Sequence, residues 1–240
     1  MNKVYAFSDL HGMYSLWEQI RDYCDETDTI YCLGDSIDRG ADGVKILIEL
    51  LKDKRVRMIK GNHEDILTIC VSEFLEGHYE NQSWWYSNGG QPTWNELKKI
   101  NDYDLNYYIN KINNLPDNTY YISTKGHQVF LSHAGTDLRY SKSDPVLMTR
   151  AYNDPYLWDR KHFHAPHPQN MDNVYQVHGH TPVQSLAKTL DIPMDNDNVK
   201  AIYYCDGHKI DIDMGSYVSK TAALIDLDDL NNIVYFKSRS

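Results

Sequence analysis

Residues 4–40 read VYAFSDLHGMYSLWEQIRDYCDETDTIYCLGDSIDRG, and this stretch decides the fold. An apolar run at residues 4–7 is followed by apolar residues at helical spacing, and a second apolar run stands at residues 29–33. Short apolar runs of this length predict buried strands. Their alternation with a helical pattern is typical of a parallel sheet covered by helices.

The alternation continues beyond this stretch. Residues 44–51 carry apolar side chains at i, i+3, i+4 and i+7, and Asp42 stands where it would cap that helix. A third apolar run at residues 56–59 precedes a helical pattern over about residues 65–76. The order strand, helix, strand, helix, strand, helix therefore extends the predicted parallel sheet.

The rest of the chain changes character twice. Residues 66–118 are mostly helical in pattern and rich in Tyr and Trp, so we interpret them as a helical insert. Six short strand patterns follow, at residues 129–131, 174–177, 202–205, 209–212, 222–225 and 233–236. We expect an α/β fold with α+β character, in which two packed mixed β-sheets are flanked by helices. Residues 1–240 contain no linker-like segment, which predicts a single domain.

Residues 133–174 form the longest irregular stretch and contain four prolines. Loops of this length in a compact domain are usually functional or mobile. We therefore expect this stretch to form a rim over the functional site.

Composition limits the partners and the compartment. Asp and Glu outnumber Lys and Arg by 34 to 24, giving a formal charge of −10. This balance argues against binding a nucleic-acid backbone, but permits a small phosphorylated ligand held by one or two arginines. The four cysteines form no CxxC pair, and no apolar run could span a bilayer. We expect reduced cysteines, no membrane association and a cytoplasmic location.

Polar residues gather where five predicted strands end. The five segments are Asp9-Leu10-His11, GDSIDRG at 34–40, GNHE at 61–64, SHAG at 132–135 and HGHT at 178–181. Sites in α/β sheets form beyond the carboxyl ends of the strands. These five loops are therefore expected to converge.

The residue types in these loops suit two divalent cations. Carboxylate, imidazole and amide oxygen without thiolate favour Mn, Fe or Zn over softer metals. Asp35 could bridge both ions, with one oxygen facing each. Two ions about 3.5–4 Å apart can clamp a phosphoryl group and activate a water. Arg39 would add paired hydrogen bonds to a phosphate.

The five segments, in this order, resemble the calcineurin-like metallophosphoesterase superfamily. The GDSIDRG and GNHE forms resemble the phosphoprotein phosphatase family, in particular its bacterial and phage serine/threonine phosphatases. The matching motifs extend from Asp9 to His180. The resemblance implies the metallo-dependent phosphatase fold, which agrees with the double sheet predicted above.

The resemblance also implies roles for single residues. The implied metal ligands are Asp9, His11 and Asp35 for the first ion, and Asp35, Asn62, His133 and His180 for the second. His63, partnered by Asp38, would protonate the leaving oxygen, and Arg39 would bind phosphate. Arg160 is the implied second phosphate-binding arginine, and Arg139 and Arg150 are its competitors. The implied cofactors are two divalent metal ions, with Mn preferred and Fe or Zn as alternatives.

Three features of the sequence allow more than one interpretation. His178 in HGHT is interpreted as a support for the ligands, with direct ligation as the alternative. The residues Trp84, Trp85, Tyr86 and Trp94 could be the core of the insert or a platform for substrate. The segment from Trp84 to Thr93, which contains Asn88-Gly89-Gly90, and the segment 211–215 both resemble bacterial members. Met214 stands where those proteins usually have Thr, which weakens any role for Asp213.

The expected function is metal-dependent hydrolysis of phosphomonoesters, with phosphoserine or phosphothreonine in proteins as the first substrate class. A symmetrical dinucleoside tetraphosphate (Ap4A) hydrolase is the closest alternative. A nuclease or cyclic-nucleotide phosphodiesterase would use the same metals, but the acidic composition and the GDSIDRG motif count against it. A catalytically inactive metal-binding scaffold is the alternative of another class, and the intact Asp38, Arg39 and His63 argue against that scaffold.

Overall fold

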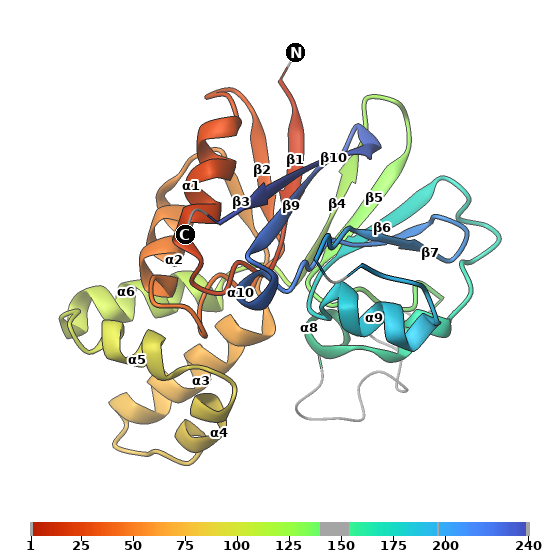
Figure 1. Ribbon diagram of the computed structural model, residues 1–240. Helices are drawn as coiled ribbons and strands as arrows, with labels where there is room; N and C mark the ends of the chain where they lie inside the picture. Colours follow the sequence, from red (N-terminus) through yellow and green to blue (C-terminus); the bar gives the residue numbers. More distant parts are fainter. Residues whose placement is uncertain (1, 140–153, 196, 239–240) are drawn as a thin grey trace.

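The computed structural model describes residues 2–139, 154–195 and 197–238. These residues form two five-stranded sheets, each flanked by helices, as predicted (Figure 1). The first sheet has the strand order β10-β9-β1-β2-β3, and the second has the order β4-β5-β6-β8-β7. The architecture is therefore α/β with two packed mixed sheets.

The first sheet is built mainly from the beginning of the chain. Its strands are β1 (Val4–Phe7), β2 (Thr29–Cys32), β3 (Val56–Met58), β9 (Thr221–Asp226) and β10 (Asp229–Lys237). β1, β2 and β3 pair in parallel, and β9 joins β1 in antiparallel orientation. The intervening helices are α1 (Tyr14–Tyr23) and α2 (Gly43–Lys52). Asp42 is the N-cap residue of α2 as predicted, but its side chain makes no capping hydrogen bond.

The second sheet has parallel central strands and antiparallel edges. Its strands are β4 (Asn118–Ile122), β5 (Gln128–Ser132), β6 (Val174–His178), β7 (Ile202–Tyr204) and β8 (Lys209–Asp211). The shorter helices nearby are α8 (Pro155–Trp158), the 3-10 helix η1 (Lys161–His164), α9 (Val183–Leu190) and α10 (Ser216–Ser219). The sequence analysis missed β4 and α9. Arg150 lies outside the described residues.

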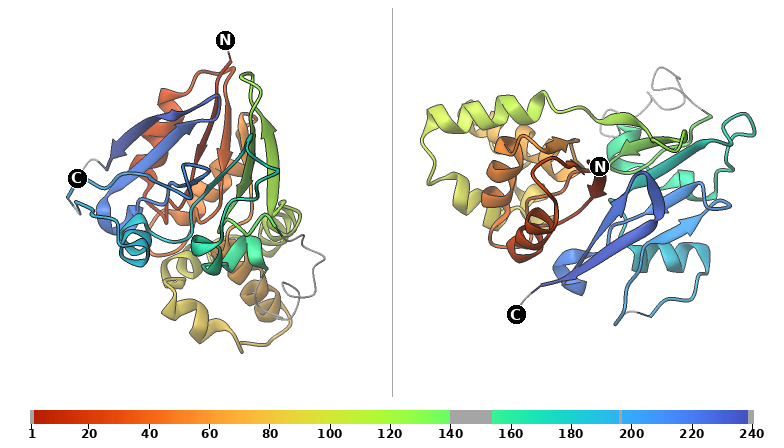
Figure 2. Two further views of the ribbon diagram at one scale, coloured as in Figure 1. Left: turned by 90° about the vertical axis from the view of Figure 1, so that its right-hand side faces the viewer. Right: turned by 90° about the horizontal axis from the view of Figure 1, so that it is seen from above.

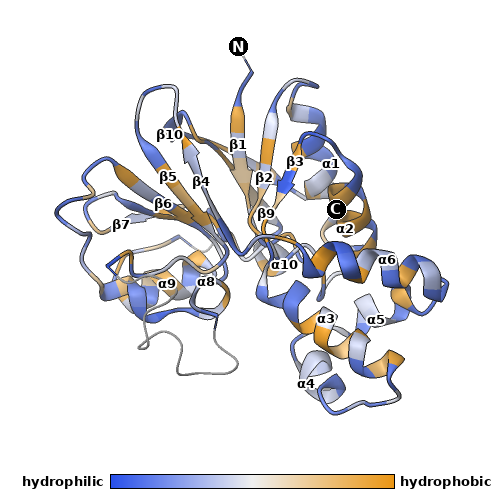
Figure 3. Ribbon diagram, turned by 180° about the vertical axis from the view of Figure 1, so that it is seen from behind, coloured by the Kyte–Doolittle hydropathy of each residue, from blue (hydrophilic) through white to orange (hydrophobic). Residues whose placement is uncertain are grey.

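The side chains of β1 alternate between two hydrophobic cores. Phe7 packs against Trp17 of α1, whereas Ala6 joins a cluster with Val129 and Val177 of the second sheet. Because side chains of a strand alternate between its two faces, one strand contributes to both cores. Figure 3 shows hydrophobic residues along β1, β5, β6 and α2, and hydrophilic residues at the turns.

The helical region between β3 and β4 lies at one end of the sheets. Its helices are α3 (Asn62–Leu75), α4 (Gln82–Ser87), α5 (Gln91–Leu97) and α6 (Asp102–Asn113). Helices α3, α4 and α5 lie at the end of the first sheet opposite the N-terminus of the chain (Figures 1 and 2). This is the end at which β1 finishes, so the helices adjoin the loops that carry the polar motifs. That residues 1–240 form a single domain stays a prediction.

Candidate metal centre

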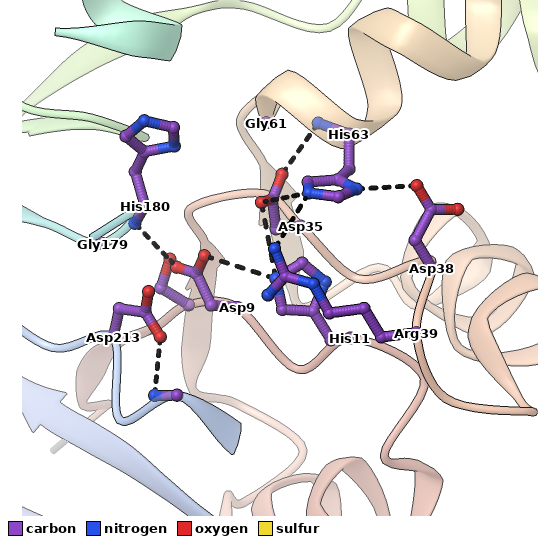
Figure 4. A network of polar contacts seen from close by, with 12 residues as sticks. Asp9, His11, Asp35, Asp38, Arg39, Gly61, His63, Gly179, His180 and Asp213 are labelled. Atoms are coloured by element: carbon purple, nitrogen blue, oxygen red, sulfur yellow. Dashed lines mark hydrogen bonds and ion pairs between the residues drawn. The ribbon is translucent and has the colours of Figure 1, made fainter. Parts of the chain in front are cut away.

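The predicted ligands come from loops after five strands and converge between the two sheets. Asp9 and His11 follow β1, Asp35 follows β2, Asn62 begins α3, and His133 and His180 follow β5 and β6. The side chains are at most 7 % exposed. Figure 4 shows Asp9, Asp35 and His180 on different loops, with the His180 backbone N–H donating to Asp9 Oδ2.

Several of these residues adopt a left-handed backbone conformation. The φ angles of Asp9, His11, Asp35, Asp38, Arg39 and His180 lie between 44° and 70°. Non-glycine residues rarely adopt such angles, and each costs of the order of 1–3 kcal/mol. The surrounding contacts therefore hold these loops in place against their local preference.

One group of atoms lies around Asn62. Its Oδ1 lies 2.7 Å from His133 Nε2 and 2.9 Å from His180 Nδ1. The two imidazole nitrogens are 3.2 Å apart. His133 Nδ1 lies 2.8 Å from the Leu33 carbonyl oxygen, which indicates that Nδ1 carries the proton and that the Nε2 lone pair faces the group. Amide oxygen and imidazole nitrogens converging in this way fit a divalent cation.

A second group lies around His11. Its Nε2 is 3.9 Å from Asp9 Oδ1 and 3.6 Å from Asp35 Oδ2. His11 Nδ1 lies 2.9 Å from the Ile37 carbonyl oxygen, which again leaves the Nε2 lone pair for the group. Asp9 Oδ1 is buried without a hydrogen-bond partner among the described residues. A buried carboxylate oxygen in that state is costly, and a cation between these atoms would satisfy it.

Asp35 joins the two groups through a single oxygen. Its Oδ2 lies 3.6 Å from His11 Nε2 and 3.4 Å from His133 Nε2. Its Oδ1 instead accepts a hydrogen bond from the His63 backbone N–H at 3.0 Å. The expectation that each oxygen would face one ion was therefore wrong, because the turn into α3 occupies one of the two oxygens.

Two triads of His and Asp residues could hold a metal ion in the described chain. They are His11, Asp35 and His63, and Asp35, His133 and His180. The first triad contains His63 where the sequence analysis expected Asp9. His63 Nε2 lies 3.8 Å from Asp35 Oδ2, but also 3.3 Å from Arg39 Nη2. A guanidinium at that distance disfavours a cation at the same nitrogen, so Asp9 remains the better candidate.

The pKa shifts reflect burial and charge pairing in this centre. Burial would raise the pKa of Asp35, but His133 and His63 beside it hold that pKa well below its usual range. Burial raises the pKa of Asp9 to about 6, although His133 opposes the shift. Burial would lower the pKa of His133, but Asp35 and Asp9 raise it to about 10. In the metal-free protein the carboxylates thus pair with a protonated His133 imidazole. Binding of divalent cations would displace that proton and free the Nε2 lone pair.

Glu64 ties two of the ligand loops together. Its Oε2 accepts the backbone N–H groups of Asp35 at 2.8 Å and Gly61 at 3.1 Å. Its Oε1 accepts the N–H of Ser36 at 2.9 Å and the Ser36 hydroxyl at 2.8 Å. The side chain is fully buried. The sequence analysis quoted Glu64 within GNHE but gave it no role.

Next to this centre lies the Asp38–His63 pair. Asp38 Oδ2 is 2.6 Å from His63 Nδ1, and Figure 4 shows the His63 ring between Asp35 and Asp38. Burial would lower the pKa of His63, but the charge of Asp35 and the hydrogen bond to Asp38 outweigh it and raise that pKa. A protonated His63 is suited to donate a proton.

The arginines considered for phosphate binding differ in their exposure and their contacts. Arg39 is half-buried beside His63, and Arg160 is exposed, with its Nε donating to Thr181 Oγ1 at 2.9 Å. Burial, His133 and then the charge of Arg160 lower the pKa of His180, so this arginine lies near the centre. Arg139 forms an ion pair with Asp137 at 2.6 Å.

The two histidines of HGHT have different surroundings. His178 Nε2 lies 2.8 Å from the Tyr204 hydroxyl, and Nδ1 lies 3.1 Å from the Gly179 carbonyl oxygen. Both ring nitrogens of His178 are therefore occupied by protein groups. His180 Nδ1 instead faces Asn62 and His133, which favours His180 as the ligand.

The aromatic cluster divides between the two expected roles. Trp85 and Trp94 are buried in the core of the insert. Trp84 is only partly buried and stacks on Trp158, with ring centroids 6.1 Å apart. Trp158 in turn packs edge-on against the His180 ring at 5.9 Å. The sequence analysis did not single out Trp158.

The sequence and the fold are similar to those of known proteins. Residues 2–212 match the calcineurin-like phosphoesterase family. A symmetrical bis(5'-nucleosyl)-tetraphosphatase of Buchnera aphidicola subsp. Schizaphis graminum (strain Sg) is 32 % identical over 82 residues, which cover 32 % of this chain and 30 % of that protein. The match thus spans less than a third of the curated relative.

Solved structures show the same fold. A putative diadenosine tetraphosphatase superposes with a TM-score of 0.61 at 17 % identity, covering 99 % of this chain and 94 % of the other. A serine/threonine protein phosphatase from Saccharomyces cerevisiae has a TM-score of 0.51 at 13 % identity, covering 100 % of this chain and 81 % of the other. Within the described residues, no helix combines the length and apolarity needed to cross a bilayer. The match over residues 2–212 shows that the chain belongs to the calcineurin-like phosphoesterase family and is a metal-dependent phosphoesterase.

Proposed function

We propose that this chain hydrolyses phosphomonoesters with two divalent metal ions. Asp9, His11 and Asp35 would hold one ion, and Asp35, Asn62, His133 and His180 the other. The observation that carries the proposal is the position of Asp35 Oδ2, which lies within 3.6 Å of a ligand nitrogen in both groups. The buried Asp9 Oδ1 has no hydrogen-bond partner among the described residues, which supports a polar occupant.

Bound divalent ions supply Lewis acidity and an activated water. The rest of the chemistry falls to the protein. Arg39 and Arg160 flank the centre and would bind the phosphoryl oxygens through charge-assisted hydrogen bonds. As the P–O bond breaks, the leaving oxygen would take the proton from His63 Nε2. Asp38 accepts from His63 Nδ1 and so turns Nε2 toward the site.

Substitution of His63 tests this assignment. In His63→Asn we expect kcat toward phosphomonoesters of basic alcohols to fall by about 10²–10⁴-fold, the usual contribution of a general acid. The bound metal, measured by inductively coupled plasma mass spectrometry, should stay at the wild-type level. His78→Asn is the matched control, since His78 is exposed on the insert. Wild-type turnover in His63→Asn would refute the assignment.

We propose that the substrates are phosphoserine and phosphothreonine in proteins. The chain would then be a serine/threonine protein phosphatase of the phosphoprotein phosphatase type. The GDSIDRG and GNHE motifs support this choice, and the exposed Arg160 beside the centre suits a phosphate on a larger molecule. The test is release of phosphate from phosphoserine and phosphothreonine peptides by the Mn-loaded protein. No release from a peptide panel would refute it.

A symmetrical dinucleoside tetraphosphate hydrolase is a second candidate with support of its own. The Buchnera relative carries that activity in its name, and the superposed structure is described as a putative diadenosine tetraphosphatase. The stacked rings of Trp84 and Trp158 beside His180 offer a surface for a nucleobase. Conversion of diadenosine tetraphosphate to two ADP, with loss of that activity in Trp84→Ala, would establish this alternative.

The donor set also guides the choice of metal. Asp, Asn and His ligands without thiolate suit Mn, with Fe or Zn as alternatives. We further propose that the protein works in the cytoplasm, because all four cysteines are free. A protein that stays inactive on p-nitrophenyl phosphate with added Mn would instead be a metal-binding scaffold.

A further inference from the structure

The helical insert makes direct contact with the proton-donor pair. Asp38 is completely buried, and three donors approach its carboxylate. Thr93 Oγ1, at the start of α5, donates to Oδ1 at 2.6 Å. Trp85 Nε1, in α4, donates to Oδ2 at 2.9 Å, beside His63 Nδ1 at 2.6 Å. Two of the three donors thus belong to the insert.

The backbone around Asp38 is fixed by the same segment. The Asp38 N–H donates to Thr93 Oγ1 at 2.9 Å, so this hydroxyl bridges the backbone and the side chain of one residue. The Arg39 N–H donates to the Gly89 carbonyl oxygen at 2.8 Å. Both Asp38 and Arg39 have positive φ angles, of 67° and 65°. Contacts from the insert therefore hold a strained turn in place.

Close packing leaves little freedom for this arrangement. A Cβ on Gly89, whose φ is +95°, would lie 2.8 Å from Arg39 Cγ. A Cβ on Gly90 would lie 2.2 Å from the Trp85 ring. Gly89 therefore lets the insert approach the Asp38–Arg39 turn closely, and Gly90 leaves room for the Trp85 ring. The Asn88-Gly89-Gly90 segment resembles a segment of bacterial phosphatases. Its two glycines are explained by these close approaches, because a Cβ at either position would clash.

We infer that Thr93 and Trp85 are positioning residues for the proton transfer from His63. The inference rests on the proposed role of His63 as the leaving-group acid. Asp38, held at both oxygens, can accept from His63 Nδ1 in one orientation only, which turns Nε2 toward Asp35 and Arg39. If Asp38 could rotate, His63 would donate its proton from a wider range of orientations, and transfer to the leaving oxygen would slow.

A positioning role and a purely structural role make different predictions. The P–O bond breaks and the leaving oxygen accepts a proton from His63 Nε2, so the need for that proton grows with the basicity of the leaving group. A weakly basic p-nitrophenolate can leave without it, whereas a more basic phenolate or an alkoxide cannot. Loss of positioning therefore reduces turnover of basic leaving groups selectively. General loosening of the fold would reduce turnover of all substrates alike.

The test uses Thr93→Val in the metal-loaded protein. Valine keeps the shape of threonine and carries a methyl group in place of the hydroxyl. kcat is measured for aryl phosphates from p-nitrophenyl to p-methylphenyl phosphate, and for an alkyl phosphate. We expect about a tenfold or larger fall for the alkyl phosphate and a change below about threefold for p-nitrophenyl phosphate. Thr93→Ser, which keeps the hydroxyl, should restore the wild-type dependence on leaving group.

Thr68→Val provides a matched control. Thr68 is also a buried threonine of the insert, and its hydroxyl bonds to Asp65 within α3 rather than to Asp38. This variant should leave the dependence on leaving group unchanged. Trp85→Phe removes the second donor and tests the inference independently if Thr93→Val does not fold. Equal losses on all substrates, or no loss, in the folded variants would overturn the inference.

His63→Asn, assayed on the same substrates, separates this inference from the proposed function. If His63→Asn shows no selective loss on basic leaving groups, the assignment of the acid itself fails. If it shows that loss while folded Thr93→Val and Trp85→Phe do not, only the positioning role fails. Metal content measured on every variant excludes lost metal as the cause.

Discussion

Replacing Glu64 by Gln should destabilise the protein more than the exchange of one oxygen for an NH₂ group suggests. Glu64 is fully buried, and its two oxygens accept from four donors on Gly61, Asp35 and Ser36. Glutamine has the same shape, but one of its two terminal groups is a donor. Any orientation of that amide therefore places an NH₂ group against protein donors.

The size of the effect follows from the two orientations. With the NH₂ group toward Gly61 and Asp35, two buried backbone N–H groups lose their acceptor. With the NH₂ group toward Ser36, the hydroxyl can rotate and accept, but the Ser36 N–H is left unpaired. A buried donor without an acceptor costs about 1–3 kcal/mol, and the lost bonds were charge-assisted. We therefore expect a loss of about 2–4 kcal/mol in the free energy of unfolding.

Urea denaturation of the metal-free protein measures this loss directly. A total stability of about 5–15 kcal/mol is typical, so the variant should remain folded but unfold at clearly lower urea. A fall in Tm of about 5–12 °C should accompany the loss. Metal affinity should also fall by about tenfold, because the loops carrying Asp35 and Asn62 lose their shared anchor.

Glu26→Gln is the control, since Glu26 is exposed on the loop after α1 and the same chemical change there should be nearly neutral. A loss below about 1 kcal/mol in Glu64→Gln would refute the reasoning. It would mean that the four contacts rearrange without cost.

Two further predictions concern the metal ligands and the contact between the sheets. His180→Ala should lose metal from one of the two sites, whereas His178→Gln should keep both ions; equal metal content in the two variants would contradict the choice of His180. Asp228 Oδ1 accepts from the Tyr121, Ser123 and Thr124 hydroxyls and from the Thr124 N–H, at 2.7–2.9 Å. Burial would raise the pKa of Asp228, but these four donors outweigh it and lower that pKa. A lowered pKa stabilises the fold above the unfolded-state value of about 3.9 and loses its effect as pH falls through the folded-state value. Asp228→Asn should therefore cost about 1 kcal/mol at neutral pH, and the difference from wild type in urea should shrink below about pH 4. A difference that stays constant down to acid pH would contradict this account.

The positions of the ligand loops could be predicted because they follow from strand order. Asp9, Asp35 and Asn62 follow the parallel strands β1, β2 and β3 of the first sheet, and parallel strands end at the same edge. His133 and His180 follow strands of the second sheet, so their convergence with the first sheet required the two sheets to pack face to face. The resemblance to known phosphoesterases supplied that step.

Other features depend on contacts that no local pattern shows. Thr93 reaches Asp38 across 55 residues of sequence, and nothing near either residue indicates the pairing. Strand β4 was missed because its side chains are largely half-exposed and its sequence NTYYI lacks a clear alternation. Helix α9 differs, since Val183, Leu186, Ala187 and Leu190 stand at helical spacing and the signal is present in the sequence.

The residues with left-handed backbone conformation around the centre imply that thermal stability and catalytic activity make opposing demands on these positions. At Asp9, His11, Asp35, Asp38, Arg39 and His180, glycine would suit the backbone better than the residue that the chain carries. A selection for thermal resistance alone, without a requirement for turnover, should therefore enrich glycine at the positions that the chemistry needs. Directed evolution of a more robust variant must spare these six positions and seek its gains elsewhere.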